Sequence, residues 1–209
     1  MAKPVIIIGA GGHAKVLLDC LRLQGVNVLG ALEKFPSLGD EAAELPIIGD
    51  DSAIHAYSCG AVELVNGIGS VGDTGLRTGI YNKFKNLGYS FRQVIHPAAT
   101  VAKNCILGEG VQIMAGAVVN TGTIIGTDSI VNTGAIVDHE CSIGCHVHIA
   151  PGVTLSGGVQ MGDCCHIGTG ATIIQGITVG EKALVGAGAV VIRDVVAGTK
   201  VLGIPARMV

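Results

Sequence analysis

The stretch from Val131 to Thr154 reads VNTGAI VDHECS IGCHVH IAPGVT, four hexads that each begin with an aliphatic residue. The same six-residue period runs without an insertion from Ile95 to Val196, over 17 consecutive hexads. The fifth position of every hexad is small or β-branched. A helix repeats near 3.6 residues and a half-buried strand near 2, so neither explains this pattern. A fixed six-residue period is typical of a parallel β-helix.

The first positions of the hexads are Ile95, Val101, Leu107, Ile113, Val119, Ile125, Val131, Val137, Ile143, Ile149, Leu155, Met161, Ile167, Ile173, Val179, Val185 and Val191. One short strand per hexad and three strands per coil give a triangular prism, whose axis these side chains fill. The sequence therefore predicts a parallel β-helix over residues 93–209, the last of them forming a C-terminal tail.

The composition suits thin coils and restricts the function. The chain has 209 residues, of which 33 are Gly and 3% aromatic, and its net charge of −3 argues against a nucleic-acid partner. The apolar run Val5–Ile8 ends at Gly9, so we expect no signal peptide, no membrane span and a cytoplasmic location. The seven cysteines are odd in number and form no CxxC, which favours structural thiols over disulfides or a metal centre.

Residues 1–92 are predicted to form a small βαβ domain of about four strands. Expected strands cover residues 5–8, 27–32 and 61–65, with a short edge segment at 46–49. An amphipathic helix is expected to follow the turn GAGGHAK (residues 9–15) and to end near Gly25. A further helix, capped by Asp50-Asp51-Ser52, is expected to run through about Tyr57, and another is expected at about 77–87.

The strand, Gly-rich turn and helix place free backbone N–H groups where phosphates bind. With Glu33 about 20 residues further on, the turn matches the dinucleotide fingerprint. Only one mononucleotide-sized half of the doubly wound fold is present, however. A single nucleotide or a nucleotide-linked molecule is therefore favoured over NAD.

Residues 18 apart stack in successive coils, about one strand spacing (~4.8 Å) from each other. His139 then lies against Gly157, which leaves room for a small reacting group and exposes a backbone N–H. Asp138 and Glu140 flank His139, and a carboxylate that orients the ring suits it to general-base catalysis. His148 and His166 are also expected to stack, either as part of a site or as a solvated surface pair.

A second cluster of residues suggests a metal site. Its members are His139, Cys141, Cys145, His146, His148 and His166. The register argues against metal binding, because Cys141 points inward and the others belong to different ladders. We therefore expect no metal.

Six motifs carry a resemblance to a known family. They read GAGGHAK, LVNGIGSVG, IHPAATVA, NTGAIVDHECSIG, HIAPGVTLSGGV and VLGIPARMV. Together they resemble the NeuD-type and PglD-like sugar acetyltransferases, which belong to the left-handed parallel β-helix (hexapeptide) acyltransferases. The resemblance covers essentially the whole chain. It implies an α/β, Rossmann-like half domain followed by a left-handed parallel β-helix, in a homotrimer with active sites between adjacent prisms.

The resemblance also implies an activity, a site and a place in glycan or surface-polysaccharide biosynthesis. The expected reaction is N-acetylation of a nucleotide-linked 4-amino sugar by acetyl-CoA, with no permanently bound cofactor. His139 would be the general base and Glu140 would orient it. Acetyl-CoA would be bound by His148, Gly157, Thr169 and Ala187, with His148 near the thioester oxygen and the Gly157 amide polarising the thioester.

The resemblance assigns the nucleotide sugar to the N-terminal domain. The substrate contacts that it implies are Gly11, Gly12, His13, Glu33, Lys34 and Gly69. The family usually has two acidic residues at the end of the second strand, and Glu33-Lys34 replaces them here. The carboxylate remains available for the base or ribose, whereas the lysine favours an additional phosphate contact.

Three other functions compete with N-acetylation. The same histidine base serves an O-acetyltransferase of sialic acid or a related sugar. A prism scaffold that only binds a sugar nucleotide or a partner protein would have no reason to place His139 and Glu140 beside Gly157. A carbonic-anhydrase-like β-helix needs three converging histidines, and the register offers no clear set.

Overall fold

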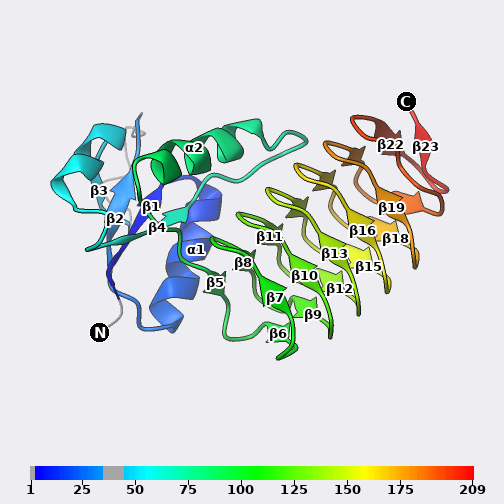
Figure 1. Ribbon diagram of the computed structural model, residues 1–209, viewed down its shortest axis with the longest axis horizontal. Helices are drawn as coiled ribbons and strands as arrows, with labels where there is room; N and C mark the ends of the chain where they lie inside the picture. Colours follow the sequence, from blue (N-terminus) through cyan, green and yellow to red (C-terminus); the bar gives the residue numbers. More distant parts are fainter. Residues whose placement is uncertain (1–2, 35–44) are drawn as a thin grey trace.

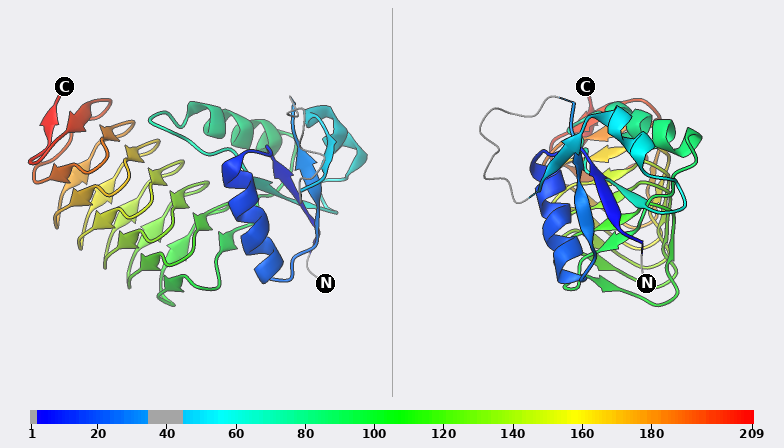
Figure 2. Two further views of the ribbon diagram at one scale, coloured as in Figure 1. Left: turned by 180° about the vertical axis from the view of Figure 1, so that it is seen from behind. Right: turned by 90° about the vertical axis from the view of Figure 1, so that its left-hand side faces the viewer.

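The computed structural model describes residues 3–34 and 45–209, which form a small α/β domain followed by a long prism (Figure 1). The α/β domain lies at one end of the prism, and the coils stack away from it towards the C-terminus (Figure 1 and Figure 2). No helix within the described ranges is long and apolar enough to cross a membrane.

The N-terminal domain is built on a four-stranded parallel sheet of order β3-β2-β1-β4. Its elements are β1 (Val5–Ile8), α1 (Gly12–Leu23), β2 (Val28–Leu32), β3 (Ile47–Gly49), the 3₁₀ helix η2 (Asp51–Ala56), β4 (Glu63–Asn66) and α2 (Gly75–Asn86). All four residues of β1 are buried, as expected of a strand covered on both faces. The four strands are those expected from the sequence, whereas α2 begins two residues before its predicted start.

The prism has three faces, and each face is a parallel sheet. The coil that contains His139 contributes one strand to each face (β12, β13 and β14), and each face is named after that strand. The β14 face comprises β5 (Val94–Ile95), β8 (Gln112–Ile113), β11 (Ile130–Val131), β14 (His148–Ile149), β17 (His166–Ile167), β20 (Leu184–Val185) and β22 (Lys200–Leu202), with β23 (Arg207–Met208) added antiparallel. The β12 face comprises β6 (Thr100–Val101), β9 (Val118–Val119), β12 (Ile136–Val137), β15 (Thr154–Leu155), β18 (Thr172–Ile173) and β21 (Val190–Val191). The β13 face comprises β7 (Ile106–Leu107), β10 (Ile124–Ile125), β13 (Ser142–Ile143), β16 (Gln160–Met161) and β19 (Thr178–Val179).

The prism axis is filled as the hexads predict. From Ile113 to Val191 every first-position side chain is at most 5% exposed, and Val111 to Val195 at the fifth positions are likewise buried. Strand pairing joins residues 18 apart throughout, such as Val137 with Leu155 and His148 with His166. Burying a Val, Ile or Leu side chain contributes about 1.5–3 kcal/mol, so the repeat itself stabilises the fold. The prediction of a left-handed parallel β-helix is confirmed.

The N-terminal domain covers the outer side of the β14 face. The outward residues Val94, Gln112 and Ile130 on this face are at most 1% exposed. By contrast, the outward residues Ile106 and Ile124 on the β13 face are largely exposed. The docked domain therefore makes the β14 face of the prism one wall of an interdomain pocket.

Candidate active site

His139 stands on the corner of the prism between β12 and β13. Its side chain is 54% exposed, and its Nδ1 lies 3.1 Å from Oε2 of Glu140. Because a carboxylate only accepts hydrogen bonds, Nδ1 carries the proton and Nε2 keeps its lone pair. Glu140 thus fixes the tautomer that a general base requires.

Asp138, the other carboxylate beside His139, has a different role from ring orientation. Its Oδ1 accepts hydrogen bonds from the backbone N–H of His139 (2.8 Å) and from Nδ2 of Asn120 (2.9 Å). The bond from the His139 N–H is the main reason why the pKa of Asp138 is lowered. Asp138 therefore holds the backbone of the corner, and of the two carboxylates Glu140 is the one that contacts the ring.

Glu140 occupies a backbone conformation that glycine adopts in the neighbouring coils. Its φ is +58°, and the stacked residues Gly122, Gly158 and Gly176 have φ of +74°, +70° and +69°. A left-handed conformation costs a non-glycine residue about 1–2 kcal/mol. Asp128, His146, Cys164 and Lys182 adopt the same conformation at another corner, so it is a property of the prism turns, and the contact with His139 is what marks Glu140.

Gly157 lies directly against the ring of His139, as the 18-residue ladder predicts. A Cβ atom at position 157 would sit 2.6 Å from both Cε1 and Nε2 of His139. Among the hydrogen bonds of residues 3–34 and 45–209, none uses the Gly157 N–H as donor. This corner thus combines an oriented imidazole, space at its Nε2 and a free backbone donor.

A second group of predicted residues lines the pocket between the N-terminal domain and the β14 face. The pocket has a volume of about 590 Å³. Its lining consists of Gly11, Gly12, His13, Val16, Glu33, Gly67, Ile68, Gly69, Ser70, Val71, Asn132 and His148. The structure therefore brings together five of the six residues predicted to bind the nucleotide sugar, and it adds His148 to them.

His148 is held by hydrogen bonds from both domains and is only 7% exposed. Its Nδ1 lies 3.0 Å from the carbonyl oxygen of Ser70, and its Nε2 lies 3.1 Å from Nδ2 of Asn132. The carbonyl requires a proton on Nδ1, so Nε2 accepts from the Asn132 amide. Burial lowers the pKa of His148 to about 3, which keeps the ring neutral.

These contacts decide between the two alternatives for the His148–His166 pair. His148 stacks edge-on with His166 as predicted, with ring centroids 5.0 Å apart, but both rings are buried rather than solvated. The contact of His148 with acetyl-CoA near the thioester oxygen, which the resemblance implies, stays a prediction. In this conformation the nitrogens of His148 are bonded to Ser70 and Asn132, and it lines the same pocket as the predicted sugar-nucleotide residues.

His13, in the first turn of α1, points towards the prism. Its Nε2 lies 2.7 Å from Oε1 of Gln112 on β8, and Gly69 packs against its Cβ. Burial lowers the pKa of His13 to about 4, because the charged ring would be poorly solvated. A neutral His13 at the mouth of the Gly-rich turn serves as a hydrogen-bonding group rather than as a phosphate counter-charge.

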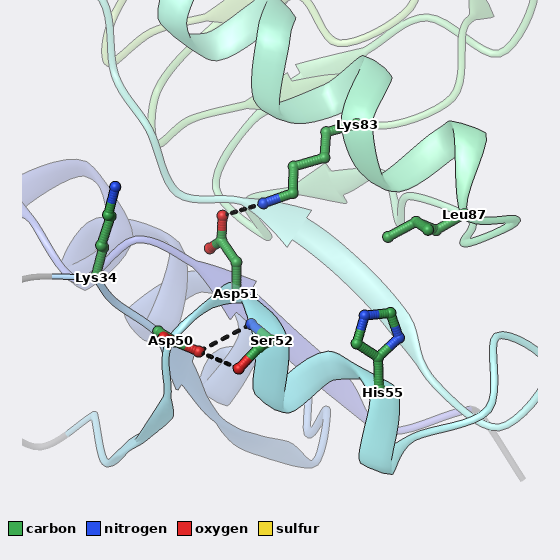
Figure 3. A pocket seen from close by; sticks show the side chains of 7 residues that line it. All are labelled: Lys34, Asp50, Asp51, Ser52, His55, Lys83 and Leu87. Carbon is green, nitrogen blue, oxygen red and sulfur yellow. Dashed lines mark hydrogen bonds and ion pairs between the residues drawn. The ribbon is translucent and has the colours of Figure 1, made fainter.

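Glu33 and Lys34 diverge, although the sequence suggested that they act at one place. Oε2 of Glu33 accepts a 3.0 Å hydrogen bond from the backbone N–H of Ala10 and so supports the Gly-rich turn. Lys34 instead lines a separate hollow with Asp50, Asp51, Ser52, His55, Lys83 and Leu87 (Figure 3). Successive residues of an extended chain point to opposite sides, which explains the separation.

The two groups do not meet within one chain. His139, Glu140 and Gly157 lie on the corner between the β12 and β13 faces, whereas His148 lies on the β14 face opposite that corner. Thr169 and Ala187, predicted to contact acetyl-CoA, lie on another corner, between the β14 and β12 faces. The prism itself separates the candidate base from the interdomain pocket.

The histidines and cysteines that suggested a metal site contact different partners in the prism. Nδ1 of His146 lies 3.1 Å from Asp128, and Sγ of the buried Cys141 faces the carbonyl oxygen of Ser156. Within the described part of the chain, no three His, Cys, Asp or Glu residues are arranged to hold a metal ion.

Sequence reasoning missed several residues that hold the predicted site residues in place. Ser70, Asn132 and Gln112 were not singled out, although each contacts a predicted site residue. Arg77 and Asp128, which form a buried ion pair between the two domains, were missed as well. The only available signal was the position of Ser70 in the Gly-rich loop after β4.

Comparisons with known proteins agree with this architecture. Residues 4–84 match the PglD N-terminal domain, and residues 140–175 match the bacterial transferase hexapeptide (six repeats). The structure of PerB from Caulobacter crescentus, in complex with CoA and GDP-perosamine, is 38% identical with a TM-score of 0.91; the match covers 100% of this chain and 98% of PerB. The acetyltransferase domain of PglB from Neisseria gonorrhoeae, in complex with acetyl coenzyme A, is 35% identical over 100% of both chains, with a TM-score of 0.91. WeeI from Acinetobacter baumannii shares the fold over 100% of both chains, at 23% identity and a TM-score of 0.81.

Proposed function

The chain belongs to the PglD-like sugar acetyltransferases of the hexapeptide-repeat acyltransferase superfamily, and we propose that it transfers the acetyl group of acetyl-CoA to the amine of a nucleotide-linked 4-amino sugar. The observation that carries this proposal is the corner where Glu140 orients His139 against Gly157. PerB, which matches over the whole chain, was solved with CoA and GDP-perosamine. A GDP-linked 4-amino sugar is therefore the first substrate to test.

The proposed reaction is a direct transfer with His139 as general base. The amine nitrogen attacks the thioester carbonyl carbon, the C–N bond forms and the C–S bond breaks. Nε2 of His139 accepts the proton of the amine, and the CoA thiolate leaves and is protonated. The unused N–H of Gly157 is suited to stabilise the developing oxyanion.

The active site is proposed to lie between subunits of a homotrimer. His139 and the interdomain pocket lie on opposite sides of one prism, so a single chain cannot present the sugar amine to its own base. In a closed ring of subunits, the corner of one prism faces the pocket of its neighbour. Exposed aliphatic side chains beside that corner, Ile124 and Ile136, are consistent with a subunit contact there.

Within this arrangement, the N-terminal pocket is proposed to hold the sugar nucleotide. Gly11 and Gly12 at the start of α1 offer backbone N–H groups to the phosphates, and Glu33 remains near the Gly-rich turn. Thr169 and Ala187 remain proposed contacts of acetyl-CoA, and Lys34 remains a proposed contact of the nucleotide. Acetyl-CoA and nucleotide sugars are cytoplasmic metabolites, so we expect the reaction to occur in the cytoplasm.

The test is a substrate panel. The protein is incubated with acetyl-CoA and with UDP-, GDP- or dTDP-linked 4-amino sugars, with free sialic acid as the alternative acceptor, and release of the CoA thiol is followed. The proposal predicts rapid release with one nucleotide amino sugar and an N-acetylated product. Release with sialic acid alone would identify an O-acetyltransferase and contradict the proposal.

A further inference from the structure

Arg77 is a buried cation that no step of the proposed reaction uses. It lies in the first turns of α2, is 1% exposed, and its Nη2 lies 2.7 Å from Oδ1 of Asp128 on the prism. Its Nε also donates to the carbonyl oxygen of Asp128 at 3.2 Å. A buried ion pair by itself is weak evidence that a residue stabilises the fold. The contacts of the third guanidinium nitrogen, Nη1, indicate another role for Arg77.

This third nitrogen, Nη1, reaches the loop that lines the interdomain pocket. It donates to the carbonyl oxygens of Asn66 (3.0 Å) and Ile68 (2.7 Å), on either side of Gly67. The same loop continues through Gly69, Ser70 and Val71, which line the pocket. One guanidinium thus joins the prism to the backbone of the pocket loop.

Gln112 makes a second, parallel connection. From β8 of the prism, its Nε2 donates to the carbonyl oxygen of Asn66 at 2.8 Å, and its Oε1 lies 2.7 Å from Nε2 of His13. The Asn66 carbonyl therefore receives one hydrogen bond from Arg77 and one from Gln112, which uses both of its lone pairs. Gln112 ties the loop and the start of α1 to one strand of the prism.

We propose that Arg77 and Gln112 are positioning residues that set the shape of the nucleotide-sugar pocket from the prism side. Neither side chain lines the pocket or reaches the reacting atoms, but Arg77 bonds to the lining residue Ile68 and Gln112 bonds to the lining residue His13. They act through the loop at Asn66–Ile68 and through His13. The inference rests on the proposed function, since it assigns the pocket to the nucleotide sugar.

Arg77→Lys is the most informative substitution. Lysine keeps a positive charge near Asp128, but a single ammonium cannot span both the carboxylate and the two loop carbonyls as the planar guanidinium does. Displacement of a binding group by about 1 Å can reduce activity by two orders of magnitude. We therefore expect the KM for the nucleotide sugar to rise about tenfold or more, while the KM for acetyl-CoA stays within about twofold.

Lys85→Met is the matched control. Lys85 lies on the same helix and also ties it to the prism, with its Nζ 2.9 Å from both carboxylate oxygens of Glu109, but its ammonium bonds to Glu109 and not to the pocket loop. Its removal loosens α2 without releasing the loop. Both KM values are expected to remain those of the wild type.

Gln112→Met provides an independent variant with no change of charge, in case Arg77→Lys does not fold. It should raise the KM for the nucleotide sugar selectively, as Arg77→Lys does. The GDP-linked 4-amino sugar and acetyl-CoA are varied separately in steady-state assays, alongside thermal unfolding of each variant. An unchanged KM for the nucleotide sugar in the folded variants, or an equal rise in both KM values, would overturn the inference. Failure of the wild type to use any nucleotide sugar would instead overturn the proposed function.

Discussion

Replacing Gly157 with alanine isolates the contact between His139 and the neighbouring coil. The new Cβ would lie 2.6 Å from Nε2 and Cε1 of His139, against the 3.4 Å at which ordinary contacts begin. The ring must therefore retreat by about 0.8 Å, and its 54% exposure leaves room for this movement. A misplacement of about 1 Å can cost two orders of magnitude in rate, so we expect kcat to fall about 10- to 100-fold.

The same substitution should leave the stability almost unchanged. Gly157 has no positive φ, so alanine fits its backbone, and the loss of chain entropy in the unfolded state contributes about 0.4–1 kcal/mol in its favour. This gain in the free energy of unfolding roughly offsets the cost of displacing the exposed His139 ring. We expect the Tm to stay within about 2–4 °C of the wild type, which corresponds to about 1 kcal/mol in a chain of this size.

Gly158→Ala is the matched control, with the opposite expectation. A Cβ at position 158 would meet nothing within 4 Å, but the φ of +70° strains any other residue. The cost of about 1–2 kcal/mol should lower the Tm while kcat stays close to wild type. Thiol release at saturating substrates and thermal unfolding are measured on the same preparations. A Gly157→Ala variant with the turnover of the wild type would refute a catalytic role for this corner.

The other predictions concern the base, its partner and the buried histidines. His139→Ala should lower kcat by orders of magnitude while calorimetry still detects CoA binding, and near-normal turnover would exclude His139 as the base. Glu140→Gly should lower kcat without lowering the Tm, because glycine relieves the left-handed backbone at φ +58°; a clear fall in Tm would contradict that strain argument. The free energy of unfolding should be flat above pH 7 and fall below pH 6.5. His148 and His13 stay neutral in the folded state down to pKa values of about 3 and 4, whereas the unfolded chain takes up their protons near 6.5. Below pH 6.5 each histidine therefore lowers the free energy of unfolding by about 1.4 kcal/mol per pH unit. Urea unfolding at pH 7, 6 and 5 measures this free energy, and a value that does not change with pH would contradict the burial of these rings.

The prism was predictable because its chemistry repeats. Each coil buries the same two hexad positions, so the register of 18 residues follows from the sequence and places Gly157 beside His139. Local signals also located the N-terminal strands and the Asp50 cap of η2, whose Oδ1 accepts from the Ser52 N–H. The Asp73 carboxylate accepts from the Gly75 N–H, a cap signal that could have set the start of α2.

The interdomain pocket was less predictable, because it depends on how two units dock. Ser70 and His148 are 78 residues apart in the sequence. They are in contact because the N-terminal domain covers the β14 face. Outward aliphatic residues do not identify that face, because Ile130 is covered whereas Ile124 on the β13 face is exposed. The buried pairing of Arg77 with Asp128 likewise has no local sequence signal.

Mixing two variants, each with one half of the proposed site removed, shows whether the active site is shared between subunits. His139→Ala removes the base and His148→Ala damages the pocket, and both residues belong to one coil but to opposite sides of the prism. In trimers assembled at random from equal amounts of the two, about a quarter of the sites would pair an intact base with the intact pocket of a neighbour. If the site is shared, acetylation of the nucleotide amino sugar should recover to about this level. A mixture no more active than the sum of the two separate variants would contradict a shared site.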